Sequence, residues 1–183
     1  MATKQDIGSD IRGRGDSLGN LFKLYRELCS SDDPTLDNTR RYHFTRYLCV
    51  LTAGFLEVSV HSIYDYYVFT YPHLVTHLAT RNKTSYQAYT DMRKPNNFNE
   101  DNLLRLTRDI LAPWEPQLVT YLQSFTQTED GTPILVKDSI NQAVDRRNEI
   151  AHGKPSSGLT QADLKKHFEV IVQLATQLHS YLR

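Results

Sequence analysis

The stretch of sequence that decides the fold is Leu48–Ser62, which reads LCVLTAGFLEVSVHS. Its apolar residues recur at the three- and four-residue steps of an α-helix, and one face collects Leu48, Leu51, Phe55, Val58 and Ser62. The apolar arc is wider than this face because Tyr47, Val50, Gly54 and His61 lie beside it. The pattern therefore predicts a long helix, from about residue 36 or 38 to residue 71, at the centre of a helical bundle.

A single carboxylate, Glu57, lies in the middle of this apolar stretch. A carboxylate that is removed from water needs a cation or hydrogen-bond donors to compensate its lost hydration. We therefore expect Glu57 to pair with a cation from another helix, and Arg147 is the candidate.

Most of the remaining chain is also expected to be helical. Apolar periodicity predicts helices over about 17–30, 99–111, 114–125 and 134–151, and a last helix that starts at Thr160. Gly153 and Pro155 fit a helix end, whereas Thr160 and Asp163 form a capping-box-like pattern. Residues 126–133 are expected to be a loop with Asp130-Gly131 as its turn, and no strand pattern is found. The fold class predicted is all-α: a helical bundle with a long central second helix and additional short helices.

Length and composition set the organisation and the setting. Residues 1–16 mix glycine with charge and lack periodicity, which predicts a flexible tail followed by a single domain over residues 17–183. Cys29 and Cys49 match no metal or redox spacing, as in a reducing compartment. No N-terminal apolar run and no uninterrupted stretch of membrane length is found, so we expect a cytoplasmic protein without a membrane partner.

The charge balance limits the kinds of partner. The chain has 21 basic and 21 acidic residues, so binding to nucleic acid would require a local patch rather than overall charge. Its 11 tyrosines favour an interface with a partner or with a second copy.

Residues 146–155 read RRNEIAHGKP and bring Arg147, Asn148 and His152 close together in sequence where a helix is expected to end. A histidine can donate and accept protons near neutral pH. An arginine provides a permanent charge that matches a phosphate. Together they form a minimal set of groups for phosphodiester chemistry that needs no metal ion.

The spacing within this motif leaves two arrangements open. Five residues in a straight helix leave two side chains about 140° apart, so Arg147 and His152 do not share a face. Either the helix unwinds before Gly153, or the pair acts across an interface between two copies. On the pattern alone, a structural role is favoured, in which His152 interacts with the helix dipole and Arg147 pairs with Glu57.

A resemblance to a known family changes this balance. Residues 147–153 resemble the R-N-x-x-x-H signature of HEPN domains, a superfamily of small α-helical proteins. Residues 51–57 look like the second-helix segment of the RiboL-PSP type of HEPN domain. Phe98-Asn99, Leu103-Leu104 and Trp114 fit the middle of that type, and Thr160 opens the expected last helix.

The resemblance implies a bundle that commonly dimerises, with the R-N-x-x-x-H elements of two copies meeting in one cleft. Many members of the family resemble metal-independent endoribonucleases, often toxins or anti-phage effectors, whereas others have lost catalysis and serve as binding modules. Carried over by position, the catalytic residues are Arg147, Asn148 and His152, with Glu57 in a supporting role. No cofactor is implied.

Further basic residues are candidates for RNA binding. They are Arg40, Arg41 and Arg46 near the start of the second helix, and Arg146 and Lys154 within the motif. His73 and His77 have helical zinc-ligand spacing but lack the glutamate of H-E-x-x-H and a third ligand, so no metal site is predicted.

The function expected is that of an endoribonuclease that leaves 2′,3′-cyclic phosphate and 5′-hydroxyl ends, in a toxin or anti-phage role. The expected partners are RNA, a second copy that completes the site, and an antitoxin or other regulatory protein. A non-catalytic RNA- or protein-binding module, or a regulatory partner of another enzyme, remains the alternative.

Overall fold

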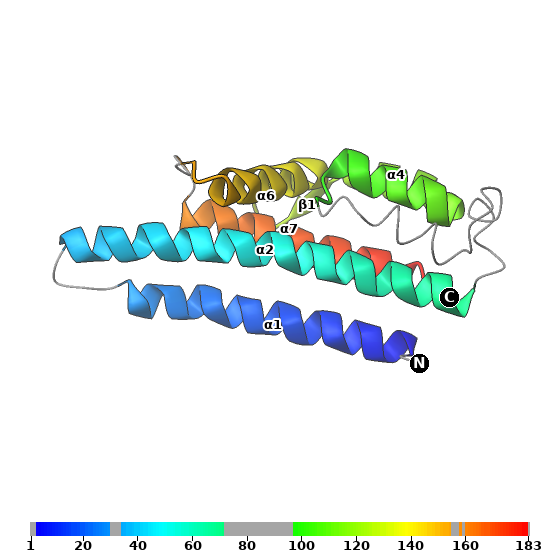
Figure 1. The fold of residues 1–183 in the computed structure, drawn as a ribbon, viewed down its shortest axis with the longest axis horizontal. Helices are drawn as coiled ribbons and strands as arrows, with labels where there is room; N and C mark the ends of the chain where they lie inside the picture. Colours follow the sequence, from blue (N-terminus) through cyan, green and yellow to red (C-terminus); the bar gives the residue numbers. More distant parts are fainter. Residues whose placement is uncertain (1–2, 30–33, 72–96, 155–157, 159, 183) are drawn as a thin grey trace.

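The long apolar helix is α2, which runs unbroken from Pro34 to Thr70 in the computed structural model (Figure 1). The structure describes residues 3–29, 34–71, 97–154, 158 and 160–182. At 1.5 Å per residue, the 37 residues of α2 extend about 55 Å. The helix packs against α1 (Lys4–Leu28), α6 (Val136–Ala151) and α7 (Gln161–Ser180). The all-α bundle with a central second helix is thus confirmed.

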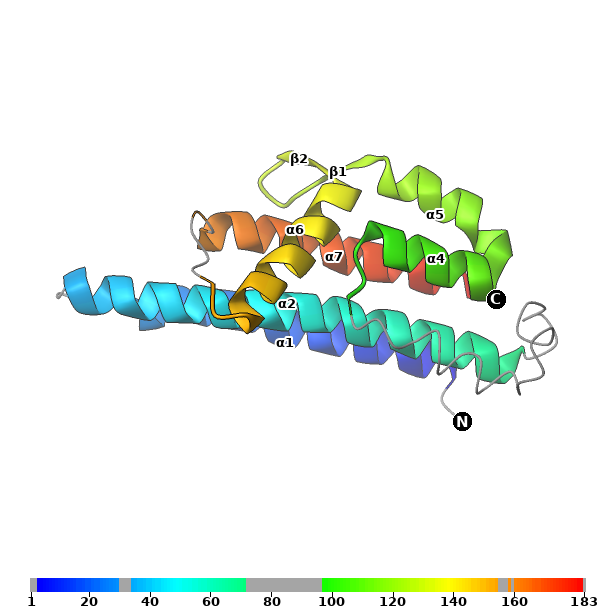
Figure 2. The same cartoon turned by 45° about the horizontal axis from the view of Figure 1, so that its top comes forward.

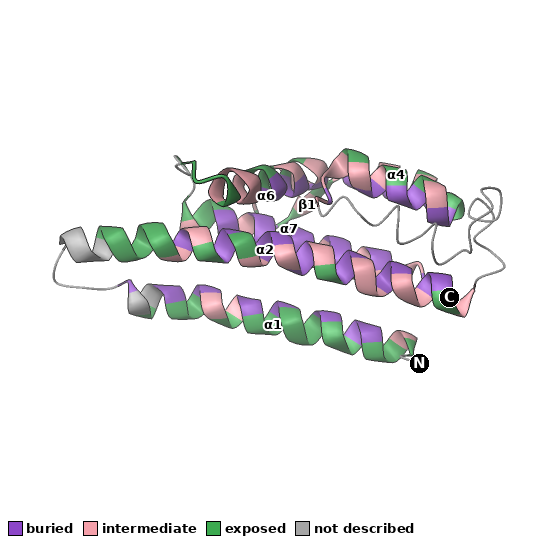
Figure 3. Cartoon of the chain, viewed as in Figure 1, coloured by how far each residue is buried: buried purple, intermediate pink, exposed green. Residues whose placement is uncertain are grey.

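The core is formed where these helices meet. Figure 1 shows α1 along one side of α2, with α6 and α4 (Glu100–Leu111) on the opposite side. In the turned view of Figure 2, α6 crosses α2 obliquely and ends beside it. Buried residues recur along α2 (Figure 3); among them Leu48, Leu56, Val60 and Ile63 have no exposed surface.

The apolar face of α2 that the sequence indicates is only partly buried. Leu48 and Phe55 lie in the core, but Val58 is 36% exposed and Leu51 is half-buried. The apolar residues surround α2, so the sequence pattern did not indicate which side meets the other helices. Val50 and Tyr47 also remain exposed.

The N-terminal segment is helical, so the prediction of a flexible tail over residues 1–16 is wrong from Lys4 onward. Thr3 caps α1 and forms a capping box with Asp6. Ile7 and Ile11 are buried and extend the apolar stripe that continues at Leu18. The stripe is interrupted in sequence by Gly15, where an added Cβ would lie 3.8 Å from Phe55 and Val172.

The middle of the chain follows the expected order of helices. Asn99 caps α4, and Pro113 lies in a 3-10 turn, η3 (Ala112–Trp114), that leads into α5 (Glu115–Leu122). The predicted Asp130-Gly131 turn is present, with Gly131 at φ +78°. It closes a hairpin of β1 (Phe125–Gln127) and β2 (Pro133–Leu135). The sequence prediction missed these strands because three residues are too few to show an alternating pattern.

Tyrosines contribute to the core as well as to the surface. Tyr64 and Tyr67 contact Trp114 with ring centroids 6.3 and 5.1 Å away, and Tyr181 contacts the same indole at 5.5 Å. Tyr42 and Tyr47 are exposed on α2. The tyrosine content therefore does not by itself indicate an interface.

The apolar character of α2 is that of a core helix. Residues Asn38–Thr70 are long and apolar enough to span a membrane by composition, and no other helix in the described part of the chain passes that test. More than half of its most apolar window is buried against the other helices of the bundle.

Candidate functional site

The motif lies on the last two turns of α6 and on the residues that follow it. Ile140, Ala143 and Val144 are buried, and Arg147 continues this side of the helix with its side chain 23% exposed. The helix ends at His152, and Gly153 adopts φ +71°. Lys154 N–H donates to the Glu149 carbonyl, and Gly153 N–H donates to that of Ile150. These two bonds form a Schellman motif, which explains why glycine follows His152.

An ion pair joins the motif to α2. An Arg147 guanidinium nitrogen lies 3.3 Å from Glu57 Oε2 and donates a hydrogen bond to it. The two side chains are 23% and 24% exposed, so the pair is shielded without being sealed from water. The predicted Glu57–Arg147 contact is confirmed, and it fixes the guanidinium at the α2–α6 boundary.

The same carboxylate has a second neighbour, His61. Its Nε2 lies 4.0 Å from Glu57 Oε1, its side chain is 12% exposed, and its ring packs edge-on against Phe98 at 5.0 Å. The sequence interpretation placed His61 on the helix but did not include it in the site. The available signal was its position four residues after Glu57, which places both on one side of a helix.

His152 lies apart from the Arg147 cluster. It is the exposed C-terminal cap of α6, and its backbone N–H donates to the Asn148 carbonyl. Within the described part of the chain, no hydrogen bond or ion pair joins the His152 and Arg147 side chains. One copy therefore presents an anchored arginine and an exposed histidine on different sides of the same helix end.

Asn148 and Arg146 are the neighbours of Arg147 in the sequence. Asn148 is half-buried, and Arg146 pairs with Glu149 at 2.9 Å. Cys49 of α2 is fully buried, near enough to Arg146 and Glu149 to interact with their charges. Burial raises the pKa of the Cys49 thiol to about 11, although the charge of Arg146 opposes the shift. The thiol is consequently protonated at neutral pH and is unsuited to act as a nucleophile.

The basic residues of α2 have different environments. Arg46 donates hydrogen bonds to the Lys154 carbonyl at 3.0 Å and to the Tyr42 hydroxyl at 2.9 Å. Arg41 donates to the Cys29 carbonyl, whereas the Arg40 side chain is exposed. The structure therefore brings Arg46 and Lys154 together beside the motif, and it places Arg40 and Arg41 further toward the start of α2.

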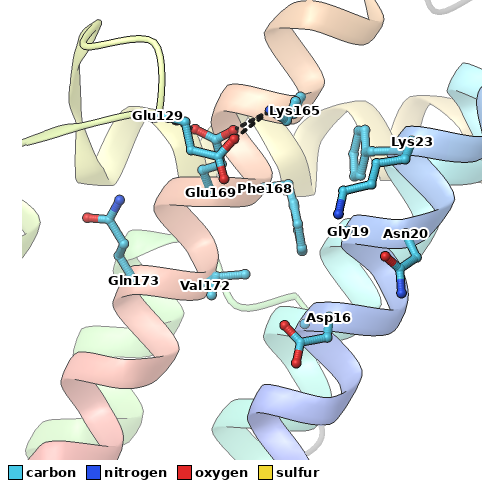
Figure 4. Close-up of a pocket in the computed structure, with 12 residues that line it drawn as sticks. Asp16, Gly19, Asn20, Lys23, Glu129, Lys165, Phe168, Glu169, Val172 and Gln173 are labelled. Carbon is cyan, nitrogen blue, oxygen red and sulfur yellow. Dashed lines mark hydrogen bonds and ion pairs between the residues drawn. The ribbon is translucent and has the colours of Figure 1, made fainter. Parts of the chain in front are cut away.

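A cavity of about 670 Å³ opens on another face, between α1, α7 and the hairpin (Figure 4). Lys165 lies there 2.8 Å from Glu129 and 3.1 Å from Glu169. Its hydrogen bond lowers the pKa of Glu129. No residue of the motif lines this cavity, and its cations are balanced by carboxylates, so it is separate from the candidate site.

Metal ligands are not clustered in the described residues. No group of three or more His, Cys, Asp or Glu side chains there could hold an ion. The prediction that His73 and His77 form no metal site stays a prediction, since both residues lie outside the described residues.

Comparison with known protein families identifies a family that the chain matches. A family model described as RiboL-PSP-HEPN matches residues 16–183, which include α2, the motif and the last helix. No curated protein and no solved structure matches the chain.

Proposed function

We propose, since the chain belongs to the RiboL-PSP-HEPN family, that it is an endoribonuclease that cleaves RNA without a metal ion. The observation that carries the proposal is the Arg147 guanidinium, which Glu57 holds half-buried beside the helix end that exposes His152. A fixed arginine and a solvent-accessible histidine are groups suited to phosphodiester chemistry.

RNA contains the nucleophile of the proposed reaction. The 2′-hydroxyl oxygen attacks the adjacent phosphorus and forms the new P–O bond, while the bond to the 5′-oxygen breaks. A histidine removes the 2′-hydroxyl proton, and an acid protonates the departing 5′-oxygen; proton transfer of this kind contributes about 10²–10⁴-fold to rate. The products are a 2′,3′-cyclic phosphate and a 5′-hydroxyl. DNA resists because it has no 2′-hydroxyl.

Each motif residue has a distinct role in this proposal. His152 transfers the proton, and Arg147 stabilises the negative charge of the phosphorane-like transition state. Asn148 holds the phosphate or His152 through its amide. Glu57 supports the reaction by positioning Arg147, and Arg146 and Lys154 add charge for the RNA backbone.

A second copy would complete the site. One chain has Arg147 and His152 on different sides of the helix end, so two copies that meet there would combine the arginine of one with the histidine of the other. Two histidines would then supply both the acid and the base. We place this homodimer in the cytoplasm, as a toxin or anti-phage effector restrained by an antitoxin or other regulatory protein.

The test is cleavage of labelled total RNA and tRNA in EDTA, with wild type beside His152→Ala. We expect wild type alone to cut, with cyclic phosphate ends, and His152→Ala to lose about 100-fold or more of the rate. Cutting by His152→Ala at the wild-type rate would refute the assigned mechanism.

A non-catalytic RNA- or protein-binding module is the second candidate. It is favoured by the ion pair itself, because Glu57 already compensates the charge that Arg147 would offer to a phosphate. Folded, dimeric wild-type protein that binds RNA and leaves it intact would support this alternative.

A further inference from the structure

The charges of this neutral chain are unevenly distributed along α2. Residues 38–56 contain Arg40, Arg41 and Arg46 and no acidic residue, although the whole chain has equal numbers of basic and acidic residues. The first carboxylate after this segment is Glu57, which lies against Arg147. Asp37 directly precedes this segment, so residues 38–56 rather than the whole N-terminal half of α2 are locally basic, the kind of patch that a polyanion requires.

The same segment exposes two aromatic rings. Tyr42 is 45% exposed and Tyr47 is 52% exposed. Five residues in a helix separate them by about 140° around the axis, so they flank the strip of α2 that contains His43 and Arg46. Two large rings left in water beside basic side chains are a feature of surfaces that stack unpaired bases.

Neighbouring side chains hold the Tyr42 ring in place. The Arg46 guanidinium lies 5.2 Å from the ring centroid and donates to the hydroxyl, and the His43 ring packs edge-on at 5.2 Å. A ring fixed before binding loses little entropy when a base stacks on it.

Arg46 also joins this surface to the motif. Its hydrogen bond to the Lys154 carbonyl places the exposed residues His152, Gly153 and Lys154 next to the basic strip of α2. A chain bound along the strip would thus reach the end of α6 directly.

We propose that Tyr42 and Tyr47 form a stacking platform for unpaired bases of single-stranded RNA, with Arg40 and Lys154 contacting its phosphates. The platform delivers the strand to His152. This inference rests on the proposed function, because the bound strand is the substrate of the proposed cleavage. It selects single-stranded RNA over duplex RNA, because paired bases stack on one another and are not available to the tyrosines.

The test is the affinity of a 12-nucleotide, fluorescein-labelled RNA that is 2′-O-methylated throughout and therefore cannot be cleaved through its 2′-oxygens. Fluorescence anisotropy compares this strand with the duplex that it forms with its complement. We expect wild type to prefer the single strand. Tyr42→Ala and Tyr47→Ala should each weaken that binding by about 5- to 150-fold, and Tyr42→Phe, which keeps the ring, should stay within about twofold of wild type.

The matched control is Phe125→Ala, because Phe125 is a 70% exposed ring on the hairpin strand β1. Its removal should leave binding unchanged. Arg40→Ala and Lys154→Ala should each reduce the slope of log K against log salt by about 0.7, the value for one single-strand phosphate contact.

The inference is overturned if wild type does not bind the single strand, or if both tyrosine-to-alanine variants bind it like wild type. A change in oligomeric state with unchanged RNA affinity would also overturn it and would assign the tyrosines to contact with a second copy. Because the probe is uncleavable, the proposed function is decided separately. If binding depends on the tyrosines but ordinary RNA is not cleaved, only the proposed nuclease activity is refuted. If cleavage depends on His152 but binding does not depend on the tyrosines, only the stacking platform is refuted.

Discussion

At the scale of single residues, the main feature of the site is that one carboxylate holds Arg147. Glu57 lies in an otherwise apolar part of α2, and it contacts Arg147 and approaches His61. The guanidinium therefore has a defined position before any ligand arrives, and a displacement of about 1 Å in such a group can cost two orders of magnitude in rate.

Replacing Glu57 by glutamine should separate position from charge. Glu57→Gln keeps the shape of the side chain but loses the charge that holds Arg147, so we expect RNA cleavage to fall about 10- to 100-fold. The free energy of unfolding should fall by about 1 kcal/mol, since the pair is one-quarter exposed. Cleavage kinetics and urea unfolding measure the two effects.

Glu149→Gln is the control. It removes the charge of the carboxylate that pairs with Arg146, and Glu149 is more exposed than Glu57. It should cost about 0.5 kcal/mol or less and leave the cleavage rate within about threefold of wild type. Equal effects of the two variants on cleavage would mean that the Glu57 contact does not position Arg147.

At the scale of elements, helices with strong periodicity and clear caps were predictable. The sequence indicated α2, the end of α6 just before Gly153 and the start of α7 after its cap Thr160, because each depends on local chemistry. The first half of α1 was missed, since its glycines suggested a loop while its burial depends on α2 and α7.

The candidate site was predictable to a similar extent. The Glu57–Arg147 pair followed from the need to compensate a carboxylate in an apolar helix. His61 lies four residues after Glu57 on α2, so its position near that carboxylate could have been predicted from the sequence. The bond of Arg46 to the Lys154 carbonyl depends on how α2 and α6 cross, and no local pattern determines that crossing.

Two glycines of α1 should respond oppositely to alanine. Nothing lies within 4 Å of a Cβ added at Gly13, so Gly13→Ala should stabilise the protein by about 0.5–1 kcal/mol through helix propensity. A Cβ at Gly8 would lie 2.9 Å from the His179 ring, which contacts the Lys4 carbonyl. Gly8→Ala should therefore lower stability by about 1 kcal/mol. Urea unfolding followed by circular dichroism compares them; stabilisation by both would contradict the described packing of α1 on α7.

At the scale of the whole molecule, the free energy of unfolding should depend on pH through one buried histidine. His167 is 8% exposed in the core, and its Nδ1 lies 3.1 Å from Ser139 Oγ. Burial lowers the pKa of His167 below its ordinary value of 6.5, although Asp163 and Asp138 act in the opposite direction. The unfolded chain consequently binds a proton at a higher pH than the folded chain does.

The sign of the pH dependence follows directly. The contribution of a neutral His167 is complete above pH 6.5 and declines as the pH falls from 6.5 through the lower folded pKa. His167→Gln should flatten this part of the stability curve while keeping a polar group near Ser139. Urea unfolding between pH 7.5 and about pH 5 tests it; an unchanged slope in the variant would assign the pH dependence to other groups.

The two ends of the described chain meet at one end of the bundle, where Lys4 Nζ donates to the Leu182 carbonyl and His179 contacts the Lys4 carbonyl. That end lies beside the last turns of α2, whereas the motif lies beside Arg46, about 35 Å away along the helix. A fusion partner, affinity tag or surface linker attached at either of these ends would thus be remote from the motif and from Arg46. The same adjacency makes the described fold suited to circular permutation: a short tether could join Lys4 to Leu182, and new ends could be opened at the hairpin turn around Gly131.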